Sequence, residues 1–309
     1  MNLISELKER LPELIPAYEI FSEEPMSKHT SFRIGGPAEL MVFPRNAEEL
    51  SKVMKTTYEM GIKPYILGGG TNVLAPDEGL RGVVIVTKDA LIGLRLLDET
   101  HISAMSGMTL AKTAMFAAQD NLSGLEFAHG IPGTVGGAVY MNAGAYGGEI
   151  KDVAVKTEFM RLDGTIEIYE GDAQGFAYRS SAFQNLDGVI LRTEFALTQS
   201  NEKDVRKKIK ELADRRRASQ PLELPSAGST FKRPKTGYAA ALIDEAGLKG
   251  LQVGGAAVSE KHAGFIVNLG GATAADVFAL VKLVQSRVFD HSGVLLEPEI
   301  RLWGAEDEN

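Results

Sequence analysis

Hydrophobic positions in the first part of the chain follow two different spacings. Short apolar runs bounded by polar or glycine-rich turns predict buried strands, and they fall at residues 39–43, 65–67 and 83–87. Helical spacing follows Asn46, which can cap a helix with Glu49 at the capping-box position, and that helix should end near Gly61. A second helix should begin at Thr109 and end by Gly124. Strands and helices therefore alternate over this region.

The rest of the chain continues the same mixture. Further strands are expected near residues 153–162, 166–169, 189–197, 253–258, 265–269 and 295–302. Helices are expected at 203–217, which is highly charged, at 238–246, and at 274–289, where Thr273 and Asp276 form a capping pair. The pattern predicts an α+β fold with a domain boundary near residues 197–204.

Composition narrows the class of protein. Hydrophobic residues make up 44% of the 309 residues and charged residues 24%, a balance that excludes a wholly disordered chain. There is no cysteine, which excludes disulfides, thiolate metal sites and cysteine nucleophiles. The formal net charge of -8 argues against general nucleic-acid binding, although a local basic patch could still hold a phosphate.

The N-terminal segment predicts a short surface helix, because Ile4, Leu7, Leu11 and Leu14 recur at helical spacing among charged residues. It has neither the apolar core nor the cleavage site of a signal peptide, and no stretch reaches the ~18–20 apolar residues of a membrane span. A cytoplasmic protein with no membrane contact is therefore expected.

The first segment that could carry chemistry is Gly68–Gly69–Gly70–Thr71–Asn72, directly after an apolar strand. Three glycines let the backbone approach a ligand closely, and their N–H groups can surround an anion. A plain turn would explain the same residues. Neither a Walker loop nor a Rossmann fingerprint fits, because no Gly-Lys-Ser/Thr follows and no helix opens here.

The second segment runs from Gly130 to Gly148, where seven of nineteen residues are glycine and charge is almost absent. A solvated loop of this length would normally carry Ser, Asp and Lys. Backbone packed under a flat or phosphorylated ligand is one explanation, and a tight structural crossover is the other. Two such segments together favour a bound dinucleotide.

Single residues have simpler explanations. The five histidines show no metal-ligand spacing, so no metal site is predicted. Arg215–Arg216–Arg217 closes the charged helix, where cations interact favourably with the helix dipole, although a grip on a pyrophosphate is the alternative. Ser229 lies in a glycine turn without a Gly-x-Ser-x-Gly elbow, so alone it would be structural.

A series of short segments lies along the chain in a fixed order. It consists of His-Thr-Ser-Phe-Arg-Ile-Gly-Gly (29–36), Gly-Gly-Gly-Thr-Asn-Val-Leu (68–74), Gly-Ile-Pro-Gly-Thr-Val-Gly-Gly (130–137), Tyr-Arg-Ser-Ser (178–181), Ala-Gly-Ser-Thr-Phe-Lys (227–232) and Leu-Glu-Pro-Glu-Ile-Arg (296–301). Taken together, these collinear segments resemble the UDP-N-acetylenolpyruvoylglucosamine reductase (MurB) family of bacterial peptidoglycan synthesis. The resemblance spans nearly the whole chain.

The resemblance implies an FAD-binding domain of the vanillyl-alcohol-oxidase type over residues 1–200, in two α+β subdomains split near 82–100. A smaller α+β substrate-binding domain would follow over 201–309. FAD would be bound non-covalently, with NADPH as co-substrate. The implied FAD-binding residues are Tyr65, Gly68, Gly69, Gly70, Thr71, Asn72, Val73, Leu74, Gly130, Pro132, Gly133, Gly136, Gly137, Asn142, Ala143, Gly144 and Gly147.

The family resemblance also implies the chemistry. Hydride would pass from the reduced flavin to C3 of the enolpyruvyl ether of UDP-N-acetylglucosamine, and Ser229 would protonate C2 to give UDP-N-acetylmuramate. Arg179 and Glu299 would flank the developing enolate, with Glu299 protonated or hydrogen-bonded to Arg179 because a bare carboxylate would oppose that charge. Glu297 stays open as the alternative carboxyl.

The chain resembles the shorter members of the family, which lack an extra tyrosine-bearing loop over the substrate. Arg217 and Lys232 are the candidates for holding the substrate diphosphate. Two other functions compete: a related FAD-linked sugar or lactone oxidase, and a non-catalytic nucleotide-binding protein. The absence of an obvious histidine or cysteine tether for flavin, together with the 227–232 and 296–301 segments, favours the reductase over the oxidase.

Overall fold

The computed structural model describes residues 3–304 and divides into two compact units. Unit 1 contains residues 1–22, 40–69 and 82–216, and unit 2 contains residues 23–39, 70–81 and 217–309. The first residues of unit 2 thus come from the N-terminal part of the chain. The expected division at residue 200 differs from this one, because compactness depends on contacts between distant segments that a linear reading does not show.

The first part of unit 1 contains most residues of a four-stranded sheet in the order β1-β2-β5-β3. Its strands are β1 (Ile20–Pro25), β2 (Pro37–Val42), β5 (Leu80–Val86) and β3 (Tyr65–Leu67), and β3 pairs with β5 in parallel. The helices α1 (Leu3–Arg10) and α2 (Ala47–Glu59) contribute buried leucines and valines to its core, including Leu7, which lies 0% exposed. The N-terminal helix therefore packs into the core on one side.

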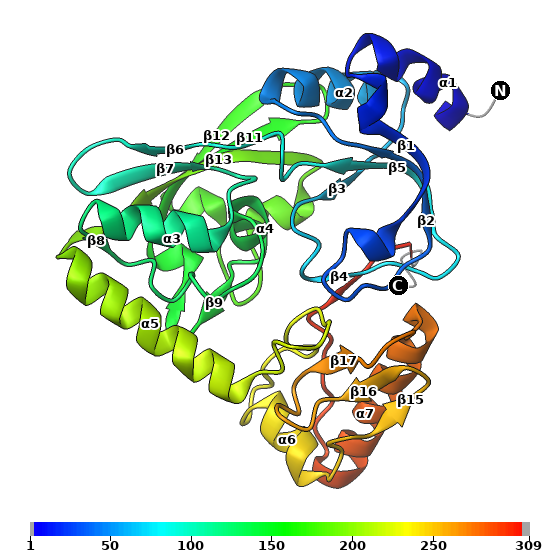
Figure 1. Cartoon of the computed structure of the whole chain (residues 1–309), viewed down its shortest axis with the longest axis vertical. Helices are drawn as coiled ribbons and strands as arrows, with labels where there is room; N and C mark the ends of the chain where they lie inside the picture. Colours follow the sequence, from blue (N-terminus) through cyan, green and yellow to red (C-terminus); the bar gives the residue numbers. More distant parts are fainter. Residues whose placement is uncertain (1–2, 305–309) are drawn as a thin grey trace. The chain divides into compact units, whose positions relative to one another are not determined.

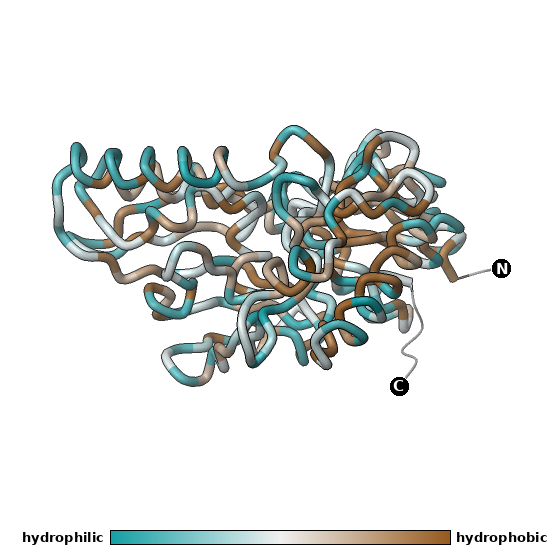
Figure 2. Tube along the Cα trace, turned by 90° about the horizontal axis from the view of Figure 1, so that it is seen from below, coloured by the Kyte–Doolittle hydropathy of each residue, from teal (hydrophilic) through white to brown (hydrophobic). Residues whose placement is uncertain are grey.

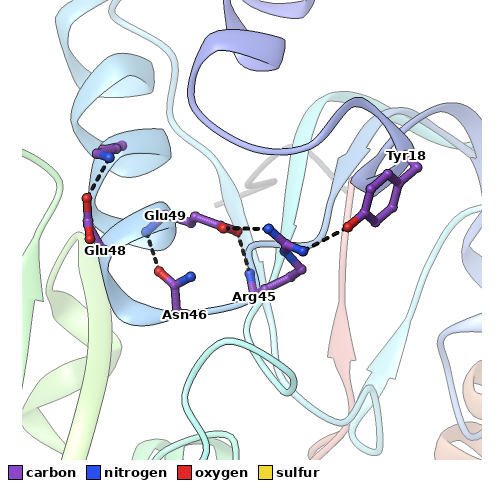
Figure 3. Close-up of polar contacts among 6 residues, drawn as sticks. Tyr18, Arg45, Asn46, Glu48 and Glu49 are labelled. Carbon is purple, nitrogen blue, oxygen red and sulfur yellow. Dashed lines mark hydrogen bonds and ion pairs between the residues drawn. The ribbon is translucent and has the colours of Figure 1, made fainter.

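The start of α2 shows how the sequence sets a helix boundary (Figure 3). The Asn46 side chain accepts a hydrogen bond from the Glu49 backbone N–H at 2.9 Å, as the capping pattern predicts. The Glu49 carboxylate turns to Arg45 instead of Asn46, accepting from its backbone N–H at 2.9 Å and from its guanidinium at 3.1 Å. Arg45 also donates to the Tyr18 hydroxyl at 2.8 Å, which fastens the helix start to the N-terminal segment.

The second part of unit 1 contains a five-stranded antiparallel sheet in the order β12-β11-β13-β7-β6. Its strands are β12 (Ile166–Glu170), β11 (Ala154–Arg161), β13 (Gly188–Ala196), β7 (His101–Met105) and β6 (Leu94–Leu96). In Figure 1, α3 (Leu110–Gln119) and α4 (Val135–Tyr140) lie along one side of this sheet. Phe159, Phe183 and Phe195, all nearly inaccessible to solvent, form the centre of its core.

The charged helix α5 (Glu202–Ser219) packs against α3 through Val205 and Ile209. Its remaining surface is polar, with ion pairs one helical turn apart such as Arg206 with Glu202. Figure 2 shows the general pattern, with brown apolar stretches inside and teal polar turns outside. The short strand β14 (Thr198–Gln199), which precedes this helix in the sequence, pairs with β8 (Leu122–Ser123).

Unit 2 has a three-stranded antiparallel sheet of β15 (Gln252–Val253), β16 (Ala256–Val258) and β17 (Ile266–Asn268), with α6 (Ala239–Glu245) and α7 (Ala274–Ser292) beside it (Figure 1). Its core joins Val277, Leu280 and Val284 of α7 to Phe32 and Ile34 from the N-terminal part of the chain. Asp77 also accepts hydrogen bonds from the Ala274 and Ala275 N–H groups at 2.7 and 2.9 Å. Thr273 and Asp276 form the predicted capping box.

The predicted strand over 295–302 is wrong in its extent. Only Arg301–Leu302 is a strand, β18, which pairs in parallel with Val73–Leu74, β4. Pro298 cannot donate a backbone hydrogen bond, so the segment before it meets residues 230–232 through isolated bonds instead of a continuous ladder. The predicted α+β class, and the helices near 46, 109, 203, 238 and 274, are confirmed. No described helix is long and apolar enough to cross a membrane.

Candidate active site

The first glycine segment follows β3, and two of its three glycines, Gly68 and Gly70, are required by the protein's own packing. In unit 1, a Cβ on Gly68 would lie 2.7 Å from the Thr134 hydroxyl oxygen. In unit 2, Gly70 has φ +62°, and a Cβ there would lie 2.0 Å from the His29 carbonyl oxygen. Packing within each unit therefore requires glycine at Gly68 and Gly70, and contact of their backbone with FAD stays a prediction. The contact with Thr134 brings the two glycine segments side by side.

Asn72 links this segment to the predicted catalytic carboxyl. Its side-chain amide donates to the Glu299 carbonyl oxygen at 3.2 Å, and its own carbonyl accepts from the Arg301 N–H at 2.9 Å. Val73 and Leu74, also predicted to contact FAD, are buried strand residues paired with β18. Thr71 is half-buried. The Asn72 side chain thus contacts the backbone of Glu299, and Val73 and Leu74 pair with the strand just after it.

The second glycine segment contains α4, which Thr134 caps by accepting from the Gly137 N–H at 3.4 Å. A Cβ on Gly136 would lie 2.8 Å from Cβ of the buried Ser106, so this glycine is needed for packing. Gly137 and Gly147 are different: a Cβ on Gly137 would meet only the Thr134 hydroxyl at 3.7 Å, and one on Gly147 would meet nothing within 4 Å. Both are exposed. Their backbone is therefore open to a ligand.

Asn142, a predicted FAD contact, is fully buried and its side chain is used inside the protein. Its amide donates to the Glu149 carboxylate and to the Ala177 carbonyl, each at 2.9 Å, and its oxygen accepts from the Lys151 N–H at 2.9 Å. A Cβ on Gly144 would lie 2.8 Å from the Gly148 carbonyl oxygen. Both residues shape the loop in unit 1.

Two basic side chains flank Gly130 at the start of this segment. The Arg216 Cδ atom lies 3.2 Å from the position of a Cβ on Gly130. Arg216 Nε and His129 Nδ1 are buried and lack hydrogen-bond partners among the described residues. Burial lowers the pKa of His129 and that of Arg216. A buried guanidinium with an unpaired N–H beside Gly130 fits an anionic ligand such as a dinucleotide diphosphate.

Arg179 lies in a tight turn of unit 1 with φ +53°. Its guanidinium donates to the Gly144 carbonyl at 3.2 Å and stacks on the neighbouring Tyr178 ring, with 5.3 Å between the guanidinium carbon and the ring centroid. The predicted catalytic arginine is therefore anchored to the second glycine segment. Tyr178 itself is 46% exposed.

Ser229 and Glu299 lie on neighbouring backbone segments of unit 2. The Glu299 N–H donates to the Thr230 carbonyl and the Lys232 N–H donates to the Glu297 carbonyl, each at 2.8 Å. The adjoining Thr230 is buried, and its hydroxyl accepts from the Ile266 N–H at 3.0 Å. Within the described residues, the Ser229 hydroxyl has no hydrogen-bond partner. The backbone thus fixes Ser229 and leaves its hydroxyl available.

The two glutamates differ in their surroundings. Glu297 is exposed, and its carboxylate lies 3.4 Å from the Lys232 ammonium in a surface ion pair. Glu299 is half-buried beside Asn72. This difference favours Glu299 over Glu297 as the reacting carboxyl. Arg217, the other predicted diphosphate contact, is exposed on the last turn of α5.

A depression of about 430 Å³ lies elsewhere in unit 1, between residues of β7, β11, β12 and β13 and the β6–β7 turn. Its charged side chains pair with one another, His101 with Asp98 and Lys156 with Glu194. The Thr100 backbone N–H holds the pKa of Asp98 at about 2. The described residues include no group of three potential metal ligands. None of the candidate residues lines this depression.

Comparison with known proteins matches two parts of the chain to known domains. Residues 38–169 match the model of an FAD binding domain, and residues 220–303 match the C-terminal domain of UDP-N-acetylenolpyruvoylglucosamine reductase. The UDP-N-acetylenolpyruvoylglucosamine reductase of Caldanaerobacter subterraneus subsp. tengcongensis is 44% identical over 300 residues, covering 96% of this chain and 98% of that protein. The reductase of Clostridium botulinum strain Hall is 42% identical over 307 residues, covering 99% and 100%.

A solved structure agrees with these sequences. The crystal structure of the Thermus caldophilus UDP-N-acetylenolpyruvylglucosamine reductase superposes with a TM-score of 0.77 at 35% identity. The match covers 92% of this chain and 98% of that one. The similarity therefore extends over both matched domains.

Proposed function

Because the chain belongs to the UDP-N-acetylenolpyruvoylglucosamine reductase family, we propose which of its residues carry out the reaction of that family. The chain is an FAD-dependent oxidoreductase that reduces UDP-N-acetylglucosamine enolpyruvate to UDP-N-acetylmuramate with NADPH, a step in peptidoglycan precursor synthesis. Bound FAD supplies hydride transfer from NADPH to C3 of the enolpyruvyl ether.

The residues that would hold FAD combine open backbone with unpaired basic groups. The exposed backbone at Gly137 and Gly147 can approach a flat ring closely. Arg216, next to Gly130, would neutralise the diphosphate. Tyr65, Gly69, Thr71, Pro132, Gly133 and Ala143 stay predicted contacts. Gly68, Gly70, Gly136, Asn142 and Gly144 would act indirectly, by shaping the backbone that the cofactor meets.

Arg179 would bind the substrate carboxylate. Addition of hydride at C3 moves negative charge onto that carboxylate, so a fixed guanidinium stabilises the transition state more than the ground state. Its anchor on the Gly144 carbonyl and its stacking on Tyr178 reduce the reorganisation needed during the reaction.

Ser229 would donate the proton to C2, and its unbonded hydroxyl on a fixed backbone is the observation that carries this proposal. A serine hydroxyl is a weak acid, but an enolate carbon is a strong base when the two atoms are held in line. Glu299 would be protonated or paired with a cation while the enolate forms, because a bare carboxylate beside it raises the energy of that charge.

Arg217 and Lys232 would hold the substrate diphosphate. The Lys232–Glu297 pair is exposed, and pairs of this kind contribute only about 0–1 kcal/mol. A substrate phosphate would therefore replace Glu297 as the partner of the Lys232 ammonium at little cost in free energy. Unlike Arg179, Ser229 and Glu299, these two cations would bind the substrate and the transition state equally well.

The Ser229→Ala variant tests the proton-donor role by separating the two half-reactions. NADPH reduces the flavin without any acid at the substrate C2 atom, so flavin content and the rate of reduction should stay near the parent values. Anaerobic reoxidation by the enolpyruvyl substrate should slow by about 10²–10⁴-fold, the range for a lost general acid. Stopped-flow absorbance measures both steps. Reoxidation at the parent rate would make Ser229 a turn residue only.

A further inference from the structure

Arg179 has a backbone conformation that its own side chain disfavours. Its φ of +53° lies in the left-handed region, which crowds Cβ against the backbone of any residue except glycine. Such a conformation persists only where the surroundings enforce it. Reciprocal hydrogen bonds close the turn around it, from the Ala177 N–H to the Ser180 carbonyl at 3.0 Å and from the Ser180 N–H to the Ala177 carbonyl at 3.1 Å.

Side chains outside the turn fasten it to the end of α4. Gln184 donates from Nε2 to the Arg179 carbonyl at 3.1 Å and to the Tyr140 carbonyl at 2.9 Å. Ser181, which is 1% exposed, donates to the same Tyr140 carbonyl at 2.8 Å. Asn142 donates to the Ala177 carbonyl at 2.9 Å. Both ends of the turn are therefore tied to the second glycine segment.

Gln184 differs from the other two because it bonds to Arg179 itself. A carboxamide nitrogen has two hydrogens, and here they match two carbonyl acceptors, one on Arg179 and one at the end of α4. The Met141 sulfur at 3.6 Å is a weaker third contact. The Arg179 guanidinium reaches the Gly144 carbonyl of the same segment. Gln184 thus links the backbone of Arg179 to the element on which its guanidinium also rests.

We propose that Gln184 is a positioning residue for Arg179, fixing the direction of the guanidinium without touching the substrate. The proposal rests on the proposed role of Arg179. A charge aimed at a developing anion is effective only while its geometry is held, and a misplacement of about 1 Å can cost about 10²-fold in rate. Loss of the Gln184 donors removes the bonds that tie the Arg179 carbonyl to the end of α4.

The test uses the holoenzyme with Gln184→Met, which keeps the length of the side chain and removes its donors. NADPH reduction, flavin content and the melting temperature should stay close to the parent values. The limiting rate of anaerobic reoxidation by the enolpyruvyl substrate should fall at least about tenfold. The substrate concentration that gives half of this rate should change less. Gln184→Lys, whose ammonium can donate to both carbonyls, should restore most of the rate.

Gln184→Glu serves as a second variant if Gln184→Met does not fold, since it keeps the shape and polarity but has no N–H, and it should show the same slow reoxidation. Reoxidation at the parent rate in either variant overturns the proposal. So does an equal slowing of both half-reactions with a lower melting temperature, which would mark a purely structural role. Arg179→Ala is measured alongside: if it also reoxidises normally, the proposed role of Arg179 has failed, and not only that of Gln184.

Discussion

The two units hold their proposed reacting groups by different means. In unit 1, Arg179 is placed by the side chains of Gln184, Ser181 and Asn142. In unit 2, Ser229 and Glu299 are placed by backbone bonds among residues 230–232 and 297–299. Backbone hydrogen bonds survive the replacement of a side chain, whereas a side-chain network does not. Substitutions at the reacting groups of unit 2 should therefore remove chemistry without moving their neighbours.

Glu299→Ala sharpens this comparison most, beside Glu297→Ala as its control. Glu299 should be needed only after the flavin is reduced, so reoxidation by the substrate should slow by about 10²-fold, or about 2.7 kcal/mol, with NADPH reduction unchanged. Glu297 pairs only with Lys232 at the surface, so its loss should leave both limiting rates unchanged. Stopped-flow absorbance measures both variants, and the reverse pattern would assign the carboxyl role to Glu297.

The adjacent glycines of α4 provide the matching test in unit 1. Gly136→Ala places a Cβ 2.8 Å from buried Ser106, so it should lower the free energy of unfolding by about 1–3 kcal/mol, as overpacking does. In Gly137→Ala the new Cβ would have only an ordinary contact with the Thr134 hydroxyl at 3.7 Å, so this variant should gain up to about 1 kcal/mol from helix propensity. Thermal melting of the apoprotein measures both.

The same pair distinguishes packing from cofactor contact. If the backbone of Gly137 faces FAD, Gly137→Ala should weaken flavin binding although the apoprotein is as stable as the parent. Titration of the apoprotein with FAD measures this affinity. Unchanged affinity in Gly137→Ala would remove this position from the cofactor site.

Arg217→Ala should have a smaller effect, confined to substrate affinity. A cation that binds the diphosphate equally in ground and transition states changes KM and leaves kcat in place, here by a few-fold because the side chain is exposed. Arg206→Ala on the same helix is the control, since Arg206 is exposed and pairs with Glu202. Steady-state kinetics with varied substrate concentration measure KM for both variants. Equal KM values would mean that Arg217 is a surface charge with no role in substrate binding.

The smallest expected effect is a dependence of stability on pH, to which one histidine in each unit contributes. Burial lowers the pKa of His129 in unit 1 and of His262 in unit 2 below the ordinary value of 6.5. The unfolded chain therefore binds protons first as pH falls through about 6.5, so stability decreases below that pH. His262 Nδ1 also accepts from the Gly264 N–H at 3.2 Å, a bond that protonation removes.

Melting temperatures between about pH 7.5 and pH 5.5 measure this loss. His129→Asn and His262→Asn should each make the melting temperature depend less on pH, because each removes one group that titrates differently in the folded and unfolded chain. An unchanged slope in both variants would mean that other groups control the acid sensitivity.

Much of the fold could be predicted because its signals are local. Asn46, Thr109 and Thr273 accept the backbone hydrogen bonds that cap their helices, as the sequence indicates. The extent of the 295–302 strand could not be predicted, because its pairing depends on residues 230–232 and 73–74. The membership of residues 23–39 and 70–81 in unit 2 likewise depends on packing with distant segments.

The candidate site was only partly visible in the sequence. A glycine that packs against Ser106 and one that faces open space are the same letter, so Gly136 and Gly137 could not be told apart. Gln184 has no signature of its own, because its role comes from the carbonyls of Tyr140 and Arg179. The run at 215–217 did signal a basic cluster, but only the structure identifies Arg216 as the one beside Gly130.

The central claim is that this chain passes electrons from NADPH to an enolpyruvyl sugar nucleotide through bound flavin. One anaerobic experiment tests it most directly, by recording the visible spectrum of the purified holoprotein during two additions. NADPH should bleach the oxidised flavin band, and UDP-N-acetylglucosamine enolpyruvate should then restore it without oxygen while UDP-N-acetylmuramate forms. A band that only oxygen restores, with the enolpyruvyl substrate unchanged, would contradict the claim and indicate an oxidase.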